Sequence, residues 1–256
     1  MTGSLAGKTL FITGGSRGIG KAIALRAARD GARIVIAAKT DEPHPKLPGT
    51  IHTAAQEIEA AGGEALAVAC DIRFEDQVLR AVERAVATFG GIDILVNNAG
   101  IATAVPASRE TPEQFRQVID INLNGSYWMA QACGRVMLPG SSIINISSVL
   151  GFTTLGLPQA AYAASKAALI GLTRDLAQQW TSRKGIRVNA LAPGFFLSEM
   201  TEQYPEGYIE SQMPRVLAGR PGDPAELAAT AVFLASDAAG YITGTTLPVD
   251  GGMLTN

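Results

Sequence analysis

Short apolar runs rich in β-branched residues alternate along the chain with longer segments of helical periodicity. In one such segment Val78, Leu79, Val82 and Val86 recur at three- and four-residue spacing. Strands joined by helices through short links form a parallel sheet that helices cover on both faces. The sequence therefore predicts an α/β fold, a single doubly wound domain over residues 1–256 with a seven-stranded parallel sheet. The predicted strands are Thr9–Thr13, Ile34–Ala38, Ala65–Cys70, Ile92–Val96, Ile143–Ile146, Val188–Leu191 and Thr245–Val249.

Length and composition narrow the class of protein. A chain of 256 residues with 47% apolar residues can bury the core of one large α/β domain. The 21 basic and 23 acidic residues leave a net charge of −2, so no basic surface for nucleic acid is expected. No apolar run is long enough to span a membrane, and Met1–Lys8 lacks the pattern of a signal peptide. We expect a cytoplasmic protein that binds a small molecule, with no nucleic-acid or membrane partner.

The cysteines and histidines give no sign of metal or redox chemistry. Cys70 and Cys133 have no close sequence partner, so we expect buried, inert thiols. His44 and His52 lie in or beside a proline-rich stretch and are expected at the surface. No metal site is predicted.

A glycine-rich turn follows the first predicted strand and precedes a helical segment. Glycine lacks a Cβ atom, so a pyrophosphate can approach the backbone there, and the helix N-terminus adds exposed N–H groups. The spacing differs from Gly-x-Gly-x-x-Gly, and a turn without a ligand is the alternative. Its place between strand and helix favours the dinucleotide-binding turn of a Rossmann fold. The predicted contacts are Gly14, Ser16, Arg17, Gly18, Ile19 and Gly20.

The end of the second predicted strand bears on the choice between NADH and NADPH. Dinucleotide-binding folds that use NAD place a carboxylate there, on the ribose 2′-hydroxyl. Here Ala38 takes that position, Lys39 and Thr40 follow, and Arg17 lies in the glycine turn. Two cations without an adjacent carboxylate suit a 2′-phosphate, so NADP(H) is predicted in preference to NAD(H). The acidic residues Asp41 and Glu42 follow closely and weaken this inference. The alternative is that Lys39 and Arg17 are only solvated surface charges.

Tyr162 and Lys166 open a long helical segment. Residues four apart share a helix face, so the phenol and the ammonium point the same way. A free phenol has a pKa near 10, and a nearby cation lowers it, so we expect Lys166 to make Tyr162 a better proton donor and acceptor.

Two further polar residues are candidates for the same site. Ser147 and Ser148 follow a predicted buried strand, at the edge where such sheets bind ligands. Side chains alternate along a strand, which favours Ser148 as the residue that faces the ligand. Asn122 lies in an apolar helical segment, where a buried amide needs a partner.

Two segments interrupt the strand and helix pattern. Residues 39–49 hold three prolines and are expected to form a long loop. Residues 195–219 are dense in apolar side chains but also hold Pro205, Gly207 and Pro214. A mobile apolar lid would look like this, and an ordinary helical excursion packed on the core is the alternative.

Together these motifs resemble the short-chain dehydrogenase/reductase family in its ordinary-length branch, and the match covers nearly the whole chain. The resemblance implies that Asn122, Ser148, Tyr162 and Lys166 form a catalytic tetrad, in which Lys166 also binds the nicotinamide ribose. Asn122 would then hold a water molecule in a proton relay. The motifs that carry the resemblance are the glycine turn, Asn97-Asn98-Ala99-Gly100, Asn122, Ser148, Tyr162 with Lys166, and Pro193-Gly194.

The resemblance also implies contacts to the rest of the cofactor. Asp71 would bind adenine, Asn98 would support the loop beside the cofactor, and Ser198 stands where the family usually has Thr beside the nicotinamide carboxamide. The full predicted set beyond the glycine turn is Ala38, Lys39, Thr40, Asp71, Ile72, Asn98, Ala99, Gly100, Tyr162, Lys166, Pro193, Gly194, Phe196 and Ser198.

The resemblance is uneven along the chain. The stretch from Ala38 to Ile51 is similar to hydroxysteroid dehydrogenase-like proteins, and the second half to 3-oxoacyl-carrier-protein reductases and polyol dehydrogenases. The segment from Ser148 to Tyr162 is about one residue longer than is typical of the family. The Val249-Asp250-Gly251-Gly252 ending usually supports a homotetramer, so a homotetramer is expected, with a dimer as the alternative.

These observations favour an enzyme that transfers hydride from NADPH to a ketone, reversibly with the secondary alcohol. A 3-oxoacyl thioester reductase is one alternative, with Arg135, Arg183 and Lys184 as a docking patch for an acidic carrier protein. A non-catalytic dinucleotide-sensing or scaffold protein is another, although such proteins typically lose part of the tetrad. A hydrophobic ketone is expected, because the predicted substrate pocket is largely apolar. It comprises Leu150, Leu155, Leu157, Phe195, Met200 and Tyr204.

Overall fold

The chain folds around one seven-stranded parallel sheet in the order β3-β2-β1-β4-β5-β6-β7. The computed structural model describes residues 4–43, 49–197, 201 and 204–255. The order of the strands reverses between β1 and β4, and such a reversal opens a crevice at the carboxyl ends of the strands. The predicted doubly wound Rossmann fold is confirmed. The strands are β1 (Thr9–Thr13), β2 (Arg33–Ala38), β3 (Glu64–Ala69), β4 (Ile94–Asn97), β5 (Ser142–Ile146), β6 (Arg187–Pro193) and β7 (Thr246–Val249).

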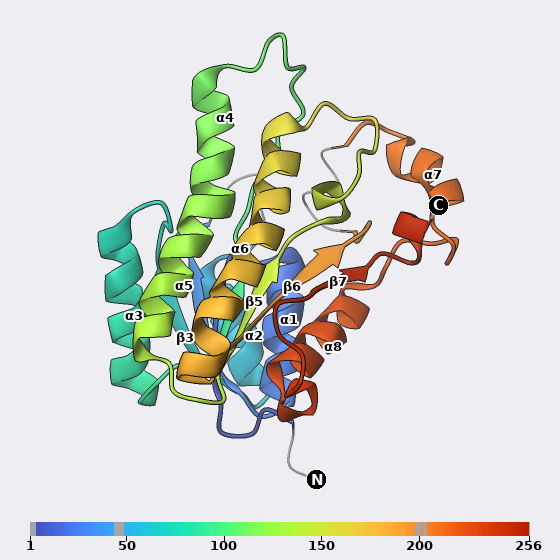
Figure 1. Ribbon diagram of the computed structural model, residues 1–256. Coiled ribbons are helices and arrows are strands. Elements are labelled where there is room, and N and C mark those ends of the chain that lie inside the picture. The colour runs from blue at the N-terminus through green and yellow to red at the C-terminus, as the bar shows by residue number, and fades with distance from the viewer. Residues whose placement is uncertain (1–3, 44–48, 198–200, 202–203, 256) are drawn as a thin grey trace.

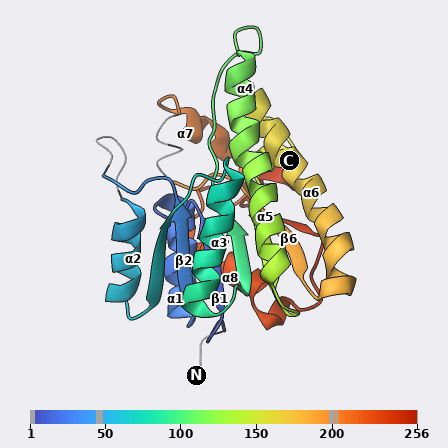
Figure 2. The ribbon, with the colours of Figure 1, turned by 90° about the vertical axis from the view of Figure 1, so that its left-hand side faces the viewer.

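Helices cover both faces of the sheet (Figure 1). On one face lie α1 (Gly18–Arg29), α2 (Ile51–Ala60) and α8 (Pro224–Ala235). On the other lie α3 (Glu75–Phe89), α5 (Gly125–Val136) and α6 (Ala160–Lys184); Figure 2 shows α3 and α5 in front of the sheet, with α6 beside α5. Among the described residues no helix is long and apolar enough to cross a membrane.

The central strands read as continuous apolar runs because both of their faces are buried. In β1, Leu10 and Ile12 pack under α1 and α8, whereas Phe11 between them packs under α3 and α5. Alternation along a strand sends successive side chains to opposite faces, so each run feeds two cores at once. This is why the runs mark the strands to within one or two residues.

Helix α4 (Pro112–Ile119) continues into α5 through a five-residue π-helical segment, Asp120–Asn124. Thr111 begins α4 with a capping box, in which its hydroxyl accepts from the backbone of Gln114 and the Gln114 side chain accepts from the backbone of Thr111. Figure 1 shows α4 rising beyond the sheet on the side where the strands end. The π-helical segment therefore lies near the crevice.

The segment 195–219 contains a short helix, α7 (Tyr208–Gln212), and a 3-10 turn, Met213–Arg215. Phe195 and Val216 are buried in a small apolar cluster with Met253 from the C-terminal end. The described part thus has the form of a helical excursion packed on the core, and the lid stays a prediction. Ser198 and Met200 lie outside the described residues.

The thiols and histidines fit the roles expected of them where the structure describes them. Cys70 and Cys133 are free and buried, and burial raises the pKa of the Cys70 thiol to about 11. His52 lies on α2 and its ring contacts the Asp41 carboxylate at 2.6 Å at the surface. His44 lies outside the described residues. Within the described ranges, no group of three His, Cys, Asp or Glu side chains is placed to hold a metal ion.

Candidate active site

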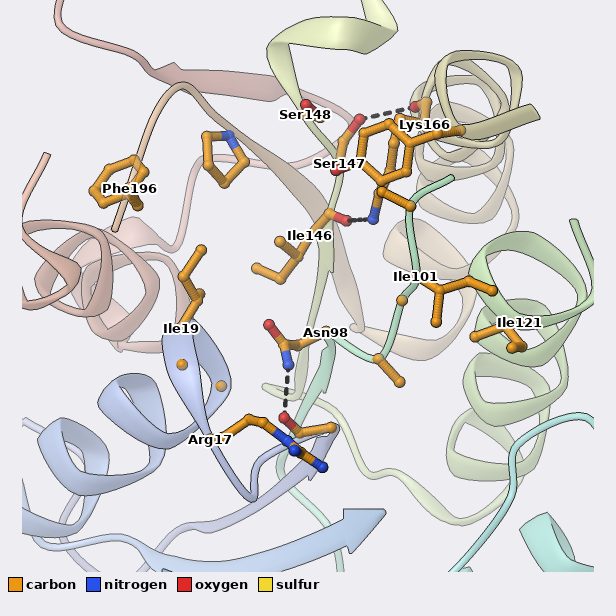
Figure 3. A pocket seen from close by; sticks show the side chains of 18 of the residues that line it. Arg17, Ile19, Asn98, Ile101, Ile121, Ile146, Ser147, Ser148, Lys166 and Phe196 are labelled. Carbon is orange, nitrogen blue, oxygen red and sulfur yellow. Dashed lines mark hydrogen bonds between the residues drawn. The ribbon is translucent and has the colours of Figure 1, made fainter. Parts of the chain in front are cut away.

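A cavity of about 480 Å³ lies where the strands end, in the crevice between β1 and β4 (Figure 3). It runs from the glycine turn to the start of α6 and the segment after β6. Nearly all the residues predicted to bind cofactor or substrate line this one cavity. They are Gly14, Ser16, Arg17, Gly18, Ile19, Gly20, Ala38, Lys39, Thr40, Asp71, Ile72, Asn98, Ala99, Gly100, Ser148, Leu150, Leu155, Tyr162, Lys166, Pro193, Gly194, Phe195, Phe196 and Tyr204.

The glycine turn needs its glycines for space. Gly14 has a φ of +66°, and a Cβ there would stand 2.9 Å from the Ala99 Cα. A Cβ on Gly20 would collide with the Asn98 side chain and with the Gly14 carbonyl. Arg17 begins α1 without a side-chain cap, and no acidic residue lies in the first turn, so the helix N-terminus presents unpaired N–H groups to an anion. The turn is built to receive a phosphate.

Asn98 holds the glycine turn against the end of β4. Its side-chain Nδ2 donates to the carbonyls of Thr13 and Gly14, each at 3.0 Å. The Thr13 hydroxyl accepts in return from the backbone N–H groups of Asn98 and Ala99, each at 3.0 Å. The supporting position that the resemblance gave to Asn98 is the position it occupies. Sequence reasoning missed Thr13, although a hydroxyl directly before the glycine turn was a usable signal.

Two cations gather where a ribose 2′-phosphate would lie. Arg17 Nη2 donates to the Thr40 hydroxyl at 2.8 Å, whereas Arg17 Nη1 is buried with no hydrogen-bond partner among the described residues. Lys39 lines the same end of the cavity. The Asp41 carboxylate, which counts against NADP(H), contacts the His52 ring. A buried, unpartnered guanidinium nitrogen fits an anionic group, so the residues present suit NADP(H).

Asp71 lines the cavity beyond these cations. A bidentate contact from the Arg73 guanidinium lowers the pKa of its carboxyl, and Lys39 adds to the effect. Asp71 is therefore ionised and fixed in orientation, which is what an acceptor for an adenine amino group requires. Its role toward adenine stays a prediction.

At the other end of the cavity, Tyr162 and Lys166 lie in the first two turns of α6, and both are buried. Lys166 Nζ donates to the carbonyl of Ile146, the last residue of β5, at 2.7 Å (Figure 3). It also lies 5.5 Å from the centroid of the Tyr162 ring. Burial lowers the pKa of Lys166 to about 8. The shared helix face expected from the four-residue spacing is observed.

The expected effect of Lys166 on the phenol is wrong for the protein alone. Burial raises the pKa of Tyr162, Tyr204 raises it further, and a hydrogen bond with Ser148 works in the opposite direction. The physical reason is desolvation, which disfavours the phenolate and cannot be read from spacing along a helix. The chain by itself keeps Tyr162 protonated, as a proton donor must be.

The side chains of the two serines after β5 point to different partners, as alternation along a strand predicts. Ser147 Oγ donates to the carbonyl of Lys166 at 2.8 Å and so fixes the helix. Ser148 caps a 3-10 turn, where its Oγ accepts from the Leu150 N–H at 3.2 Å, and it also hydrogen-bonds to Tyr162. Of the two, Ser148 is the one whose hydroxyl joins the Tyr162 phenol.

Asn122 has a different place from the other three polar residues. It sits in the π-helical segment, fully buried, and is not part of the cavity wall. Its side chain accepts from the Ile101 N–H and donates to the Ile101 carbonyl, both at 2.9 Å, and donates to the Ser165 hydroxyl at 3.0 Å. Ser165 in turn donates to the carbonyl of Tyr162 at 2.7 Å. Asn122 therefore ties the loop after β4 to the helix that carries Tyr162, and its part in a proton relay stays a prediction.

Two other predicted sets lie away from the cavity wall. Leu155 lines the cavity, whereas Leu157 of the same loop is half-buried and is not among the lining residues, so its place in the substrate pocket stays a prediction. The basic patch of Arg135, Arg183 and Lys184 lies at the far ends of α5 and α6, and Lys184 Nζ donates to the Gly134 carbonyl at 2.7 Å. The rise along α6 from Tyr162 to Arg183 is roughly 30 Å. A carrier protein docked there would be remote from the cavity.

A crevice with a phosphate-binding turn at one end and a buried proton donor at the other is that of a dinucleotide-dependent oxidoreductase. Comparison with known proteins agrees. The family model described as "Enoyl-(Acyl carrier protein) reductase" matches residues 14–254. The chain belongs to the short-chain dehydrogenase/reductase family, whose members are oxidoreductases that use NAD(P).

Similar proteins span this family. Hydroxysteroid dehydrogenase-like protein 2 from Bos taurus is 49% identical over 196 residues, which are 75% of this chain and 46% of that protein. The chain thus spans about half the length of the curated relatives it matches. A short-chain dehydrogenase/reductase from Mycobacterium marinum has a TM-score of 0.92 at 35% identity, covering 98% of this chain and 97% of the other. A protein from Beutenbergia cavernae, described as an NAD(P)-dependent gluconate 5-dehydrogenase with bound NADP, has a TM-score of 0.88 at 38% identity, with 98% of each chain covered.

Proposed function

We propose that this protein reduces a ketone to the secondary alcohol, reversibly, with NADPH preferred over NADH. The observation that carries the proposal is the burial of Tyr162, Ser148 and Lys166 in the cavity that also holds the glycine turn. NADPH, when bound, supplies the hydride. Arg17 and Lys39 are the residues that would hold its 2′-phosphate.

The reaction then depends on three side chains. The Ser148 and Tyr162 hydroxyls hydrogen-bond the substrate oxygen and hold it where negative charge develops. Tyr162 gives its proton to that oxygen, and a buried acid of raised pKa keeps the proton until the charge appears. The Lys166 ammonium is anchored on the Ile146 carbonyl and does not lower the pKa of Tyr162 in the protein alone, so its proposed role is to stabilise the phenolate once the cofactor and substrate are bound.

The wall around these residues favours a hydrophobic substrate. Leu150, Leu155 and Phe195 line the cavity beside Tyr162, and apolar linings with few polar groups are common to small-molecule sites. A panel of ketones, 3-oxo esters, steroids, polyols, a 3-oxoacyl thioester and an enoyl thioester tests the proposal. Absorbance of the reduced nicotinamide with NADPH and NADH is the measurement. We expect turnover of apolar ketones with NADPH, and equal turnover of polyols would contradict it.

The alternatives have less support. The family description names an enoyl thioester reductase, and a 3-oxoacyl thioester would also meet Ser148 and Tyr162, so both remain in the panel. The proposed carrier-docking patch is remote from the cavity, which weighs against a carrier-bound substrate. A dinucleotide-sensing or scaffold role would leave the buried Tyr162, Ser148 and Lys166 without a purpose.

We also propose a homotetramer, with a dimer as the alternative, in the cytoplasm. Helix α8, edge strand β7 and the connection between them expose large apolar side chains at Phe233, Leu247 and Tyr241, a pattern common at interfaces. Truncation after Val249 would also remove the buried Met253, so Leu247→Lys is the cleaner test. We expect this variant to have a lower mass by light scattering than the unaltered protein. An unchanged mass would contradict an interface at β7, and cell fractionation tests the location.

A further inference from the structure

Tyr204 is a polar residue in the largely apolar part of the cavity wall, which also includes Thr201. Its ring packs edge-on against Tyr208 with centroids 5.2 Å apart. The Tyr208 hydroxyl donates to the Leu155 carbonyl at 2.7 Å, and Leu155 lines the same cavity. The Tyr204 ring thus packs against a side chain that is itself hydrogen-bonded to the loop before α6.

The Tyr204 hydroxyl has one fixed partner and faces the site of chemistry. Gln159, which is 6% exposed, hydrogen-bonds to it and lowers its pKa against the effect of burial. Tyr204 and Tyr162 line the same cavity, and the Tyr204 phenol acts electrostatically on Tyr162.

We take the Gln159 amide N–H as the donor to the phenol oxygen, and the Tyr204 hydroxyl then still has its own proton to donate. When a substrate covers a hydrogen-bond donor in an apolar wall without supplying an acceptor, the donor loses its water and binding is weakened. The site therefore favours substrates that carry an acceptor at this point. The acceptor must lie close to the carbonyl that Tyr162 binds, because both phenols face the same part of the cavity. It must therefore be a second oxygen of the substrate.

We propose that Tyr204 is a specificity-determining residue that donates a hydrogen bond to a second oxygen of the substrate, a few bonds from the reacting carbonyl. The substrate class is then a largely apolar ketone with a neighbouring carbonyl or hydroxyl oxygen, such as a 3-oxo ester, rather than a simple ketone. Gln159 is a positioning residue that orients the Tyr204 hydroxyl. The inference rests on the proposed ketone reduction, since Tyr162 fixes the first oxygen.

A matched pair of substrates tests this. Ethyl 3-oxobutanoate and 2-heptanone have the same chain length and the same reacting carbonyl, but only the first has a second carbonyl. We expect the unaltered protein with NADPH to favour the ester. Tyr204→Phe keeps the ring contact with Tyr208 and should lower the ester-to-ketone ratio of kcat/KM about tenfold, mainly through the KM of the ester. Gln159→Leu should lower the ratio in the same direction by less.

Tyr208→Phe is the control, because it removes a hydroxyl that does not line the cavity. It should move kcat/KM for both substrates together and leave their ratio unchanged. An unchanged ratio in folded Tyr204→Phe, or a preference of the unaltered protein for 2-heptanone, would overturn the inference and leave ketone reduction standing.

Failure of the proposed function would look different. If the unaltered protein turns over neither substrate, binding of ethyl 3-oxobutanoate in the presence of NADP+ is measured by calorimetry instead. A Kd about tenfold higher in Tyr204→Phe would support the inference about Tyr204, and an equal Kd would overturn it.

Discussion

Tyr162→Phe is expected to lower kcat/KM for ketone reduction by about 10²–10⁴-fold while NADPH still binds. The phenol is buried, hydrogen-bonded to Ser148 and kept protonated by its surroundings, so removing its oxygen removes the proton source. The phenylalanine ring fills the same space, and the fold should be kept. Initial rates measure the loss, and NADPH fluorescence measures binding.

Tyr127→Phe is the matched control, since it removes a tyrosine hydroxyl from α5 outside the cavity. It should keep the activity of the unaltered protein. Activity of Tyr162→Phe close to that of this control would take Tyr162 out of its role.

The pH profile separates Lys166 from Tyr162. With a pKa of about 8, Lys166 is charged below that pH and loses its charge above it, whereas Tyr162 stays protonated because its pKa is raised. The kcat/KM for reduction should therefore fall above about pH 8, approaching tenfold per pH unit. A rate that stays flat to pH 10 would mean that the Lys166 charge is not needed.

The second large effect concerns the cofactor. Lys39→Asp is expected to lower the ratio of kcat/KM with NADPH to that with NADH by about ten- to a hundredfold, because a charge-assisted contact is replaced by a like charge beside the 2′-phosphate. Arg17, whose Nη1 has no hydrogen-bond partner among the described residues, would remain there. Initial rates with each dinucleotide at a fixed ketone concentration give the ratio.

Lys21→Asp is the control for this change. Lys21 lies on α1 and pairs with Glu57 at 3.1 Å, so the substitution alters the net charge by the same amount outside the cavity. Its ratio should stay that of the unaltered protein. If Lys39→Asp behaves like Lys21→Asp, Lys39 is only a surface charge.

The features that the sequence predicts well are those set by residues close together along the chain. The strands were found because residues such as Phe11 and Ile12 are buried on opposite faces, which leaves a continuous apolar run. The choice of Ser148 over Ser147 followed from alternation, and the shared face of Tyr162 and Lys166 from helix geometry. All three depend only on neighbours along the chain.

The errors depend on tertiary structure. The raised pKa of Tyr162 comes from burial and from the electrostatic effect of Tyr204, which lies in a distant segment of the chain. Nothing local fixes which leucine of the loop before α6 points inward, so the sequence cannot tell that Leu155 rather than Leu157 lines the cavity. The π-helical segment that positions Asn122 has no sequence signature, and its partners Ile101 and Ser165 lie 21 and 43 residues away.

The anchoring of Lys166 on a main-chain carbonyl has a consequence for how such a site can change over time. The partner of the ammonium is the Ile146 backbone oxygen, which every residue type provides. The Asn98 side chain likewise donates to main-chain carbonyls, those of Thr13 and Gly14. Neighbouring positions are therefore free to mutate for packing without loss of the proton donor's support. Residues such as Leu150 and Tyr204 can diverge under selection for new substrates while the reaction is inherited unchanged.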